Sequence, residues 1–514
     1  MKGPKHIVVI GSGAGGLCAA SYCAYWGASV TVLEQAAQTG GFINPFKRKG
    51  YHFDPGVHYI GDLQPGQLVY RVFEDLGLDP SSLFCELDPT GFDHYRFPDF
   101  EFRFGRGLDN FKENLLLSFP EEKLGIEAYF KLANRLSKGT EGVYDFLHGI
   151  PKISRWTSML SALPNFTRIN RETYGSLLDR MFTGSRIKSV LAANGGNYGL
   201  PPSKVPALLG LGMWLHFASG AFFPRGGSGG MKNALENVIT ENGGQLLTRK
   251  EVTNIVLKGK QVVAVKTADG DEIEADAIIS AIEPKHTFGR LIGPEHLSPR
   301  LTKKLDKLRS SLSSFCVFLG MRRDLREYGF GNFNIWSYPN QDPELFNTIS
   351  DTKSSPREQA LILSPNSLKD DSGKMVPDKG CSTLEVISLT PFEPWEKWDK
   401  MRSYKRGEEY EARKKAMGKS FIEVIEERFP DVIGDVEVEE FATPVTNSYY
   451  VNTVAGGIYG PEMAPDQMGP SRFLPVTPFK GLYLAGSGTF GGGIGPCLAS
   501  GKVAARFALR RWFA

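Results

Sequence analysis

Apolar and polar residues follow one another at the start of the chain in a pattern that predicts a β–α–β unit. Ile7–Ile10 is an apolar, mostly β-branched run, typical of a strand buried in a parallel sheet. Leu17–Trp26 predicts a helix with small residues on one side, and Gly27 is placed to end it. Ser29–Leu33 predicts the second strand. We therefore expect an α/β fold with helices packed on a parallel sheet.

Further elements are expected in the centre and at the end of the chain. A central helix with apolar positions from Ala234 to Ile239 is followed by predicted strands at Leu246–Thr248, Val252–Lys258, Gln261–Thr267 and Glu272–Ser280. A later group of predicted strands comprises Ser314–Leu319, Ala360–Leu363 and Thr383–Leu389, before a charged helix around Ser403–Phe429. A strand ending at Gly486 and a helix over Cys497–Leu509 are expected last. Asp370–Lys379 predicts a polar surface loop, and Ala207–Pro224 is an apolar stretch expected to line a cavity.

Composition narrows the function classes. The 514 residues are 41% hydrophobic, enough for a large core and more than one domain. The net charge of +3 gives no basic bias of the kind that nucleic-acid binding requires. The six cysteines form no CxxC pair and no metal-ligand spacing, so we expect reduced thiols and no metal site.

A glycine motif joins the first predicted strand to the first helix. Gly11-Ser12-Gly13-Ala14-Gly15-Gly16 fits G-x-G-x-x-G. In this motif the first glycine permits a tight turn, the second lets a pyrophosphate approach the backbone, and the last lets helix and strand pack closely. Glu34, 23 residues after Gly11, ends the second strand and can accept hydrogen bonds from ribose hydroxyls. The combined pattern predicts a dinucleotide site at the helix N-terminus, with Gly11, Gly13, Ala14, Gly15, Gly16 and Glu34 as contacts.

Gly40 and Gly41 follow the acidic residue, and this pair resembles a signature of the glutathione-reductase-like flavoproteins. The resemblance implies FAD as the cofactor and a discontinuous Rossmann-type FAD-binding domain. It also implies that C-terminal residues return to the flavin, for which Gly486, Ser487, Gly493 and Ile494 are the candidates. Many members carry an acid where this chain has Ser487. Two central positions complete the implied site, Val252 near the adenine and Ala281 near the pyrophosphate.

These elements predict two domains. The FAD-binding domain is expected to comprise residues 1–75, 215–300 and 455–514. A mixed α+β substrate-binding domain is expected from the two inserts, residues 76–214 and 301–454.

The stretch Tyr51–Gly61 resembles the family of FAD-dependent oxidoreductases that comprises carotenoid desaturases, carotenoid isomerases and retinol saturases. Further matches, closest to the retinol saturases, are Phe223–Ser228, Trp395–Trp398, Lys405–Glu411, Pro444–Asn447 and Tyr459-Gly460. The resemblance implies chemistry on carbon–carbon double bonds of an isoprenoid polyene, by saturation, desaturation or cis–trans isomerisation. It also implies that Gly56, Val57 and His58 approach the flavin.

His52 and His58 both lie near the expected approach to the flavin; His58 is the candidate catalytic residue, and a structural histidine is the alternative for either. Tyr449 and Tyr450 are expected to be aromatic lining of the cavity. Only one complete dinucleotide fingerprint is present, so electrons are expected to come from or go to a separate donor or acceptor, such as a quinone, oxygen or a redox partner. A different class is a non-catalytic relative similar to the Rab-escort proteins, which bind prenylated partners. The intact glycines and Glu34 argue against it.

The protein is expected to be cytoplasmic, with possible peripheral contact to a membrane. Phe146–Arg171 contains Lys152, Arg155, Arg168 and Arg171 and no acidic residue. Its apolar residues at helical spacing, with Trp156 among them, predict a face that suits an anionic bilayer surface. An ordinary amphipathic helix on the core is the alternative.

Overall fold

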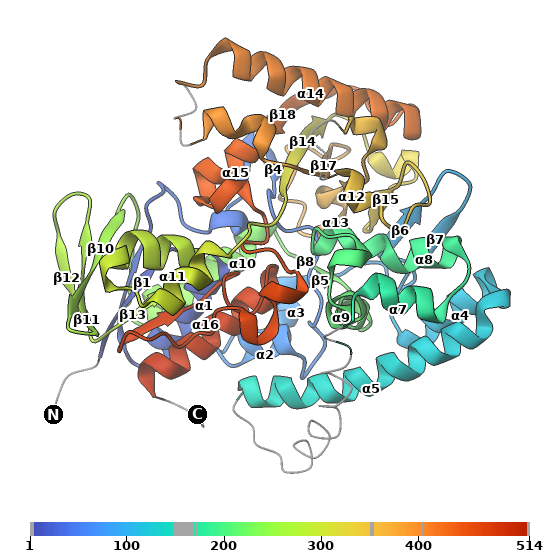
Figure 1. Cartoon of the computed structure of the whole chain (residues 1–514). Helices are drawn as coiled ribbons and strands as arrows, with labels where there is room; N and C mark the ends of the chain where they lie inside the picture. Colours follow the sequence, from blue (N-terminus) through green and yellow to red (C-terminus); the bar gives the residue numbers. More distant parts are fainter. Residues whose placement is uncertain are drawn as a thin grey trace.

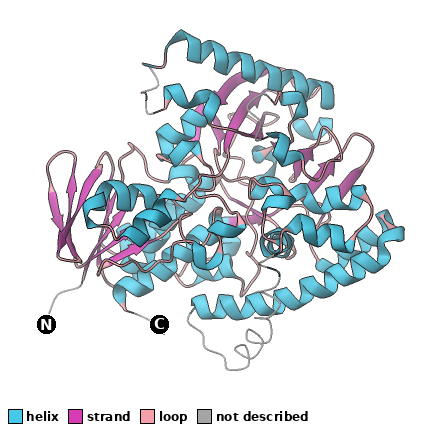
Figure 2. Cartoon of the chain, in the orientation of Figure 1, coloured by secondary structure: helices cyan, strands magenta, loops and turns pink. Residues whose placement is uncertain are grey.

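The computed structural model describes residues 5–148, 169, 172–349, 354–399, 401 and 405–510 (Figures 1 and 2). The basic segment predicted to contact a membrane therefore lies almost entirely outside the described residues. No helix in the described part of the chain is long and apolar enough to cross a bilayer.

One of the two main sheets is parallel and has five strands, in the order β19-β13-β1-β2-β9. Its strands are β1 (His6–Ile10), β2 (Ser29–Leu33), β9 (Gln245–Leu247), β13 (Ala277–Ser280) and β19 (Leu482–Leu484). The central strand β1 is apolar because helices cover the sheet, and Ile7, Val8 and Val9 are fully buried. The helices that pack with it are α1 (Ala14–Tyr25), α10 (Ser228–Glu241) and α16 (Ile494–Leu509), with α2 (Leu68–Glu74) against α16. Both ends of the chain and its centre thus meet in one layer (Figure 1).

A small antiparallel sheet extends from the parallel one. It contains β10 (Val252–Lys258), β11 (Gln261–Thr267) and β12 (Glu272–Glu274). The single strand predicted over Glu272–Ser280 is wrong, because β12 and β13 belong to different sheets. The ladder partner changes between them: Ala275 N–H donates to Val263 O, whereas Asp276 N–H donates to His6 O.

A seven-stranded mixed sheet forms the second layer, in the order β18-β14-β17-β16-β15-β6-β7. Its strands are β6 (Asp93–Arg96), β7 (Glu101–Phe104), β14 (Ser313–Met321), β15 (Asn334–Ser337), β16 (Leu361–Ser364), β17 (Ser382–Thr390) and β18 (Val436–Ala442). Six neighbour pairs make up the sheet; five are antiparallel, and β15 pairs with β6 in parallel. The three strands predicted in the second insert are confirmed. Helices α13 (Asn366–Lys369), α14 (Gly407–Arg428) and α15 (Pro444–Val451) lie against this sheet.

Helices of the first insert enclose an aromatic core. They are α4 (Leu108–Ser118), α5 (Lys123–His148), α7 (Tyr174–Met181), α8 (Ser185–Ala192) and α9 (Ala207–Phe217). The apolar stretch at Ala207–Pro224, predicted to line a cavity, forms α9 and β8 (Phe222–Pro224). Trp214 of α9 is buried in this core, and its indole N–H donates to Leu191 O at 3.0 Å. The short strand β5 (Phe84–Glu86) pairs with β8 and joins the insert to the centre of the chain.

The two main sheets draw their strands from different ranges of the chain, whereas the β5–β8 pair joins these ranges. All five strands of the parallel sheet fall in residues 1–75, 215–300 and 455–514, and all seven of the mixed sheet fall in 76–214 and 301–454. We propose these ranges as the FAD-binding and substrate-binding domains.

Candidate functional site

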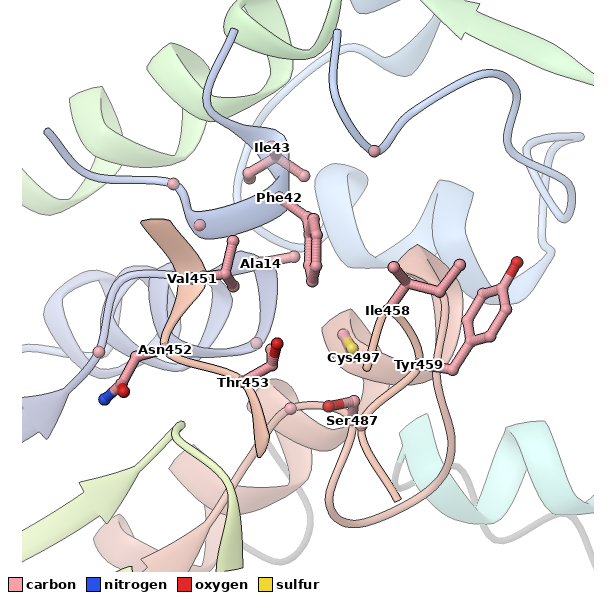
Figure 3. Close-up of a pocket in the computed structure, with 18 of the residues that line it drawn as sticks. Ala14, Phe42, Ile43, Val451, Asn452, Thr453, Ile458, Tyr459, Ser487 and Cys497 are labelled. Atoms are coloured by element: carbon pink, nitrogen blue, oxygen red, sulfur yellow. The ribbon is translucent and has the colours of Figure 1, made fainter. Parts of the chain in front are cut away.

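A large cavity lies between the two main sheets and is lined by segments from the whole length of the chain. Its empty space measures about 1860 Å³, including the open mouth. One end is lined by Gly11, Gly13 and Glu34, and the other by side chains of the mixed sheet. Figure 3 shows Ala14 of α1 and Ser487 and Cys497 of the C-terminal motif around the same space.

Each glycine of the first motif has a separate structural reason. Gly11 has a φ of +88°, the left-handed region that favours glycine. A Cβ on Gly16 would lie 2.0 Å from the carbonyl oxygen of Gly11, so helix and strand could not pack with a larger residue there. A Cβ on Gly13 would meet no atom within 4 Å and would enter the cavity. This open space beside a bare backbone fits a pyrophosphate.

Two helices point their N-termini at the cavity without a side-chain cap. The N-cap of α1 is Gly13 and that of α16 is Gly493, and neither helix has a capping side chain. Their first N–H groups are therefore available, with the positive ends of the helix dipoles, to negative charge on a ligand. The two helices meet directly, since a Cβ on Gly15 would lie 3.1 Å from the carbonyl oxygen of Cys497 in α16.

Glu34 lines the cavity and also holds the glycine turn. One carboxylate oxygen accepts from Ser12 N–H at 3.0 Å and from the Ser12 hydroxyl at 2.6 Å, and the other accepts from Ala36 N–H at 2.9 Å. The sequence predicts only the ribose role, so the local role is an addition. A carboxylate has capacity for further donors besides these three.

Gly40 and Gly41 extend the same wall of the cavity. Both have positive φ angles, +116° and +55°. Gly40 bridges to Gly13 in parallel, and its N–H donates to Ser12 O at 3.1 Å. A Cβ on Gly41 would be 3.4 Å from the Cα of Gly13, so the pair runs directly beside the glycine turn.

Of the seventeen residues predicted to contact the cofactor, fifteen line the cavity. They are Gly11, Gly13, Ala14, Gly15, Glu34, Gly40, Gly41, Gly56, His58, Val252, Ala281, Gly486, Ser487, Gly493 and Ile494. Gly16 lies behind them at the helix–strand contact. Val57 is 1% exposed and packs in the hydrophobic core with Ile43 and Ile60 instead of lining the cavity.

The far end of the cavity is apolar and aromatic. It is lined by Trp336, Ile362, Ile387, Leu389, Ile458 and Tyr459. Four of them come from the adjacent strands β15, β16 and β17. Sequence reasoning missed these residues, since an apolar strand position gives no sign of which cavity it faces. Of the two tyrosines expected to line the cavity, Tyr450 does so.

Five ionisable side chains gather beside this end: Asp54, His58, Asp93, Lys369 and Glu385. Asp54, Asp93, Lys369 and Glu385 are buried, and His58 is partly exposed to the cavity. Lys369 Nζ donates to the backbone oxygen of His58 at 2.8 Å. Sequence reasoning found only His58, because the other four residues are brought to it by the mixed sheet and its edges.

Burial shifts the acid–base properties of this cluster. It raises the pKa of Asp54 and of Asp93 to about 6, and it raises the pKa of Glu385 well above the usual range. Burial lowers the pKa of Lys369 to about 7. Burial first, and the charge of Lys369 second, lower the pKa of His58 to about 3. Clustered shifts of this size beside a cavity are typical of functional sites.

The Asp54 shift predicts a pH dependence of stability. Its pKa rises from 3.8 to about 6 on folding, so its contribution is complete below 3.8 and is lost as the pH rises through about 6. Asp54→Asn removes this titration. The free energy of unfolding of the wild type relative to the variant is expected to fall by about 3 kcal/mol across that interval. Urea unfolding of both proteins at a series of pH values measures it, and parallel curves would contradict the shift.

Comparisons with known proteins find relatives that match nearly the whole chain. Over 98% of its length the chain is 27% identical to all-trans-retinol 13,14-reductase of Homo sapiens, of which it covers 85%. It is 26% identical to the chloroplastic prolycopene isomerase of Arabidopsis thaliana, with 94% of this chain and 79% of that protein covered. The expected resemblance is therefore confirmed.

Solved structures share the fold. An oxidoreductase from Methanosarcina mazei superimposes with a TM-score of 0.63 at 18% identity, over 98% of this chain and all of that one. Putrescine oxidase superimposes with a TM-score of 0.62 at 14% identity, over 99% of each chain. The family described as flavin containing amine oxidoreductase matches residues 14–509. The chain belongs to this family of flavin-containing oxidoreductases, and its cofactor is FAD.

Proposed function

We propose that the protein is an FAD-dependent reductase that saturates a carbon–carbon double bond of an isoprenoid polyene. The observation that carries the proposal is the continuity of one cavity, from the glycine turn at Gly13 to the apolar end at Trp336. A polyene is apolar along its length, and burial in such an end is favourable by about 25 cal/mol per Å² of apolar surface. The near full-length similarity to all-trans-retinol 13,14-reductases supports saturation.

Different groups of cavity residues would bind the different parts of FAD. Glu34 would accept hydrogen bonds from the adenosine ribose, and Val252 would contact the adenine. The bare backbone at Gly13 and the N-terminus of α1 would bind the pyrophosphate. The N-terminus of α16, with Ser487 beside it, would favour negative charge on the flavin ring.

Bound FAD supplies hydride exchange with a carbon atom, which is the difficult part of the reaction. The chain must then orient the polyene, exclude water and move one proton. The side chains of Ile387, Leu389 and Ile458 would orient and shield an apolar substrate. His58 is the ionisable side chain of the cluster that lines the cavity, and we assign it the proton.

Isomerisation is the second candidate, favoured by the similarity to prolycopene isomerases. Desaturation would use the same cavity in the oxidising direction. Product mass separates the three after anaerobic incubation of candidate polyenes with the reduced enzyme and, in parallel, with the oxidised enzyme, because only oxidised flavin can accept a hydride during desaturation. Saturation adds two hydrogens, desaturation removes two, and isomerisation changes only the retention time. Recovery of unchanged polyene from every incubation would contradict all three.

Electron supply and membrane contact complete the proposal. We expect a separate redox partner, a quinone or oxygen to exchange electrons with the flavin. An insoluble substrate would be taken from lipid, for which Phe146–Arg171 is the proposed contact. Flotation with anionic and with neutral liposomes tests it, and equal behaviour on both would contradict an electrostatic contact.

Glu34→Ala is expected to weaken FAD binding. The ribose loses a charged acceptor, which costs about 1–3 kcal/mol, or roughly 5- to 150-fold in Kd. Because Glu34 also orders Ser12, Glu34→Gln is the matched control that keeps an acceptor near the turn. Titration of the apoprotein with FAD measures both, and we expect the alanine variant to bind more weakly than the glutamine variant. Unchanged affinity in both would sink the assignment.

A further inference from the structure

His58 has one ring nitrogen inside the protein and one toward the cavity. The side chain is 19% exposed and lines the cavity. Its Nδ1 atom is buried and lies 3.6 Å from Oε2 of Glu385. The exposed edge of the ring is therefore the edge that carries Nε2, on the side where a substrate would bind.

Glu385 places an ionisable carboxyl group at a fully buried position of the mixed sheet. It lies within β17, a strand whose nine residues are all buried. Oε1 accepts a hydrogen bond from Asp54 N–H at 2.7 Å, whereas buried Oε2 has no hydrogen bond of normal geometry to a described residue; the side-chain amide of Asn366 lies beside this carboxyl, with its Nδ2 also unsatisfied. An ionised carboxylate there would cost several kcal/mol. Because Oε1 already accepts from Asp54, a proton on this carboxyl would be carried by Oε2, 3.6 Å from Nδ1 of His58.

The groups around Glu385 can stabilise the carboxylate that forms when it releases a proton. Lys369 lies in the same buried cluster, and among the described residues its Nζ donates to neutral oxygens only. Those oxygens belong to His58, Asn334, Ser364 and Asn366. The other charged or titratable groups around the pair are Asp54 after β4 (Tyr51–Phe53), Asp93 on β6 and Cys316 on β14. A carboxylate formed on Glu385 would be stabilised by the ammonium of Lys369.

We infer that Glu385 and His58 form a proton relay that delivers the proton of the reduction to the substrate carbon. This inference rests on the proposed function and extends it. His58 is the catalytic residue because it lines the cavity. Glu385 acts through His58 as a positioning residue that stores the proton, and Lys369 stabilises the resulting carboxylate.

The step balances in protons and electrons. The Nε2 proton of His58 moves to one carbon of the double bond, whose π electrons form the new C–H bond. The proton on Oε2 of Glu385 moves to Nδ1, which leaves a neutral imidazole and a carboxylate. Bound reduced FAD would supply the hydride for the adjacent carbon. Water then returns a proton to Nε2 while Nδ1 gives its proton back to Glu385, so the pair is reset.

The first test needs neither substrate nor flavin turnover. Infrared spectra of the wild type and of Glu385→Gln, compared at neutral pH, are expected to differ by the carbonyl band of a protonated carboxyl that shifts in heavy water. Glu122→Gln is the matched control, since Glu122 is also buried but accepts from Thr183 N–H at 2.9 Å, away from the cavity. If Glu385→Gln leaves every protonated carboxyl band in place, the relay is overturned.

A second measurement needs no variant. Nitrogen-15 spectra of histidine-labelled wild type, with His58→Gln used only to assign the signals, report which ring nitrogen carries the proton. We expect the proton on Nε2 and an unprotonated Nδ1 that accepts from Glu385. A proton on Nδ1 at neutral pH would overturn the relay.

Kinetics then separate the relay from the proposed function. Glu385→Gln keeps the shape and the FAD content but cannot release a proton, so substrate-driven oxidation of the reduced enzyme should slow about 100-fold or more. Glu122→Gln should stay within about twofold of the wild type. A rate for Glu385→Gln within about twofold of the wild type would overturn the relay. If the wild type turns over no polyene, the proposed function fails, and the spectra still decide the state of Glu385 and His58.

Discussion

Gly13→Val is expected to yield a folded protein that purifies without FAD. The backbone at Gly13 has a φ of −63° and a ψ of 176°, which a branched residue adopts readily. A Cβ there would meet no described atom within 4 Å. It would instead fill the space assigned to the pyrophosphate. Loss of about two charged hydrogen bonds costs about 4 kcal/mol, or roughly 1000-fold in Kd.

The measurement is the flavin-to-protein ratio from the visible spectrum, together with circular dichroism of the same sample. The sequence alone predicts a poorly soluble product, whereas the open space around Gly13 indicates that the apoprotein retains its fold. Gly13→Ala is the graded control and should lose less flavin. A yellow, active valine variant would mean that the pyrophosphate binds elsewhere.

Gly16→Ala, three residues further along the chain, is expected to destabilise the fold, because at this position a side chain has no space. Its Cβ would lie 2.0 Å from the carbonyl oxygen of Gly11 and 3.0 Å from the Cβ of Ala281. The carbonyl oxygen of Gly11 belongs to the turn that follows β1. This backbone cannot move without separating the helix from the sheet. Overpacking of this kind costs about 3 kcal/mol or more.

Thermal unfolding of the apoprotein and soluble yield would show this loss. Gly212→Ala is the matched control, because Gly212 lies inside α9 and a Cβ there meets nothing within 4 Å. That variant should be as stable as the wild type or slightly more stable, since alanine favours a helix. A Gly16→Ala protein with unchanged melting temperature would contradict the packing at the glycine turn.

The cofactor end of the site could be predicted because its determinants are local. The turn, the helix N-terminus and Glu34 fall within one β–α–β unit, and their spacing is fixed by the geometry of that unit. The return of the C-terminal segment was predicted from a resemblance, and the structure places Gly486 against Gly15. The ends of strands are harder to predict from the sequence. The break between β12 and β13, for example, depends on hydrogen-bond partners that are distant in sequence.

The polar cluster could not be predicted from the sequence. Glu385 lies in a strand whose other residues are four apolar and four Ser or Thr, and Lys369 directly precedes a stretch that reads as a polar surface loop. That reading is wrong for two of its residues: Asp370 is buried and accepts from Gly226 N–H at 2.9 Å, and Met375 is 1% exposed. Contacts between distant segments accompany this burial: Asp370 lies against Gly226, 144 residues away, and Lys369 against His58, 311 residues away. Single-residue patterns carry no information on such contacts.

The most direct test of the account is a single turnover observed without oxygen. Reduced, FAD-loaded enzyme is mixed with one equivalent of an all-trans polyene, and the flavin spectrum and the product mass are followed together. The account predicts that the flavin is reoxidised and that each flavin yields one product molecule with two added hydrogens. Flavin that stays reduced, while the polyene is recovered unchanged or only isomerised, would contradict reduction of the double bond.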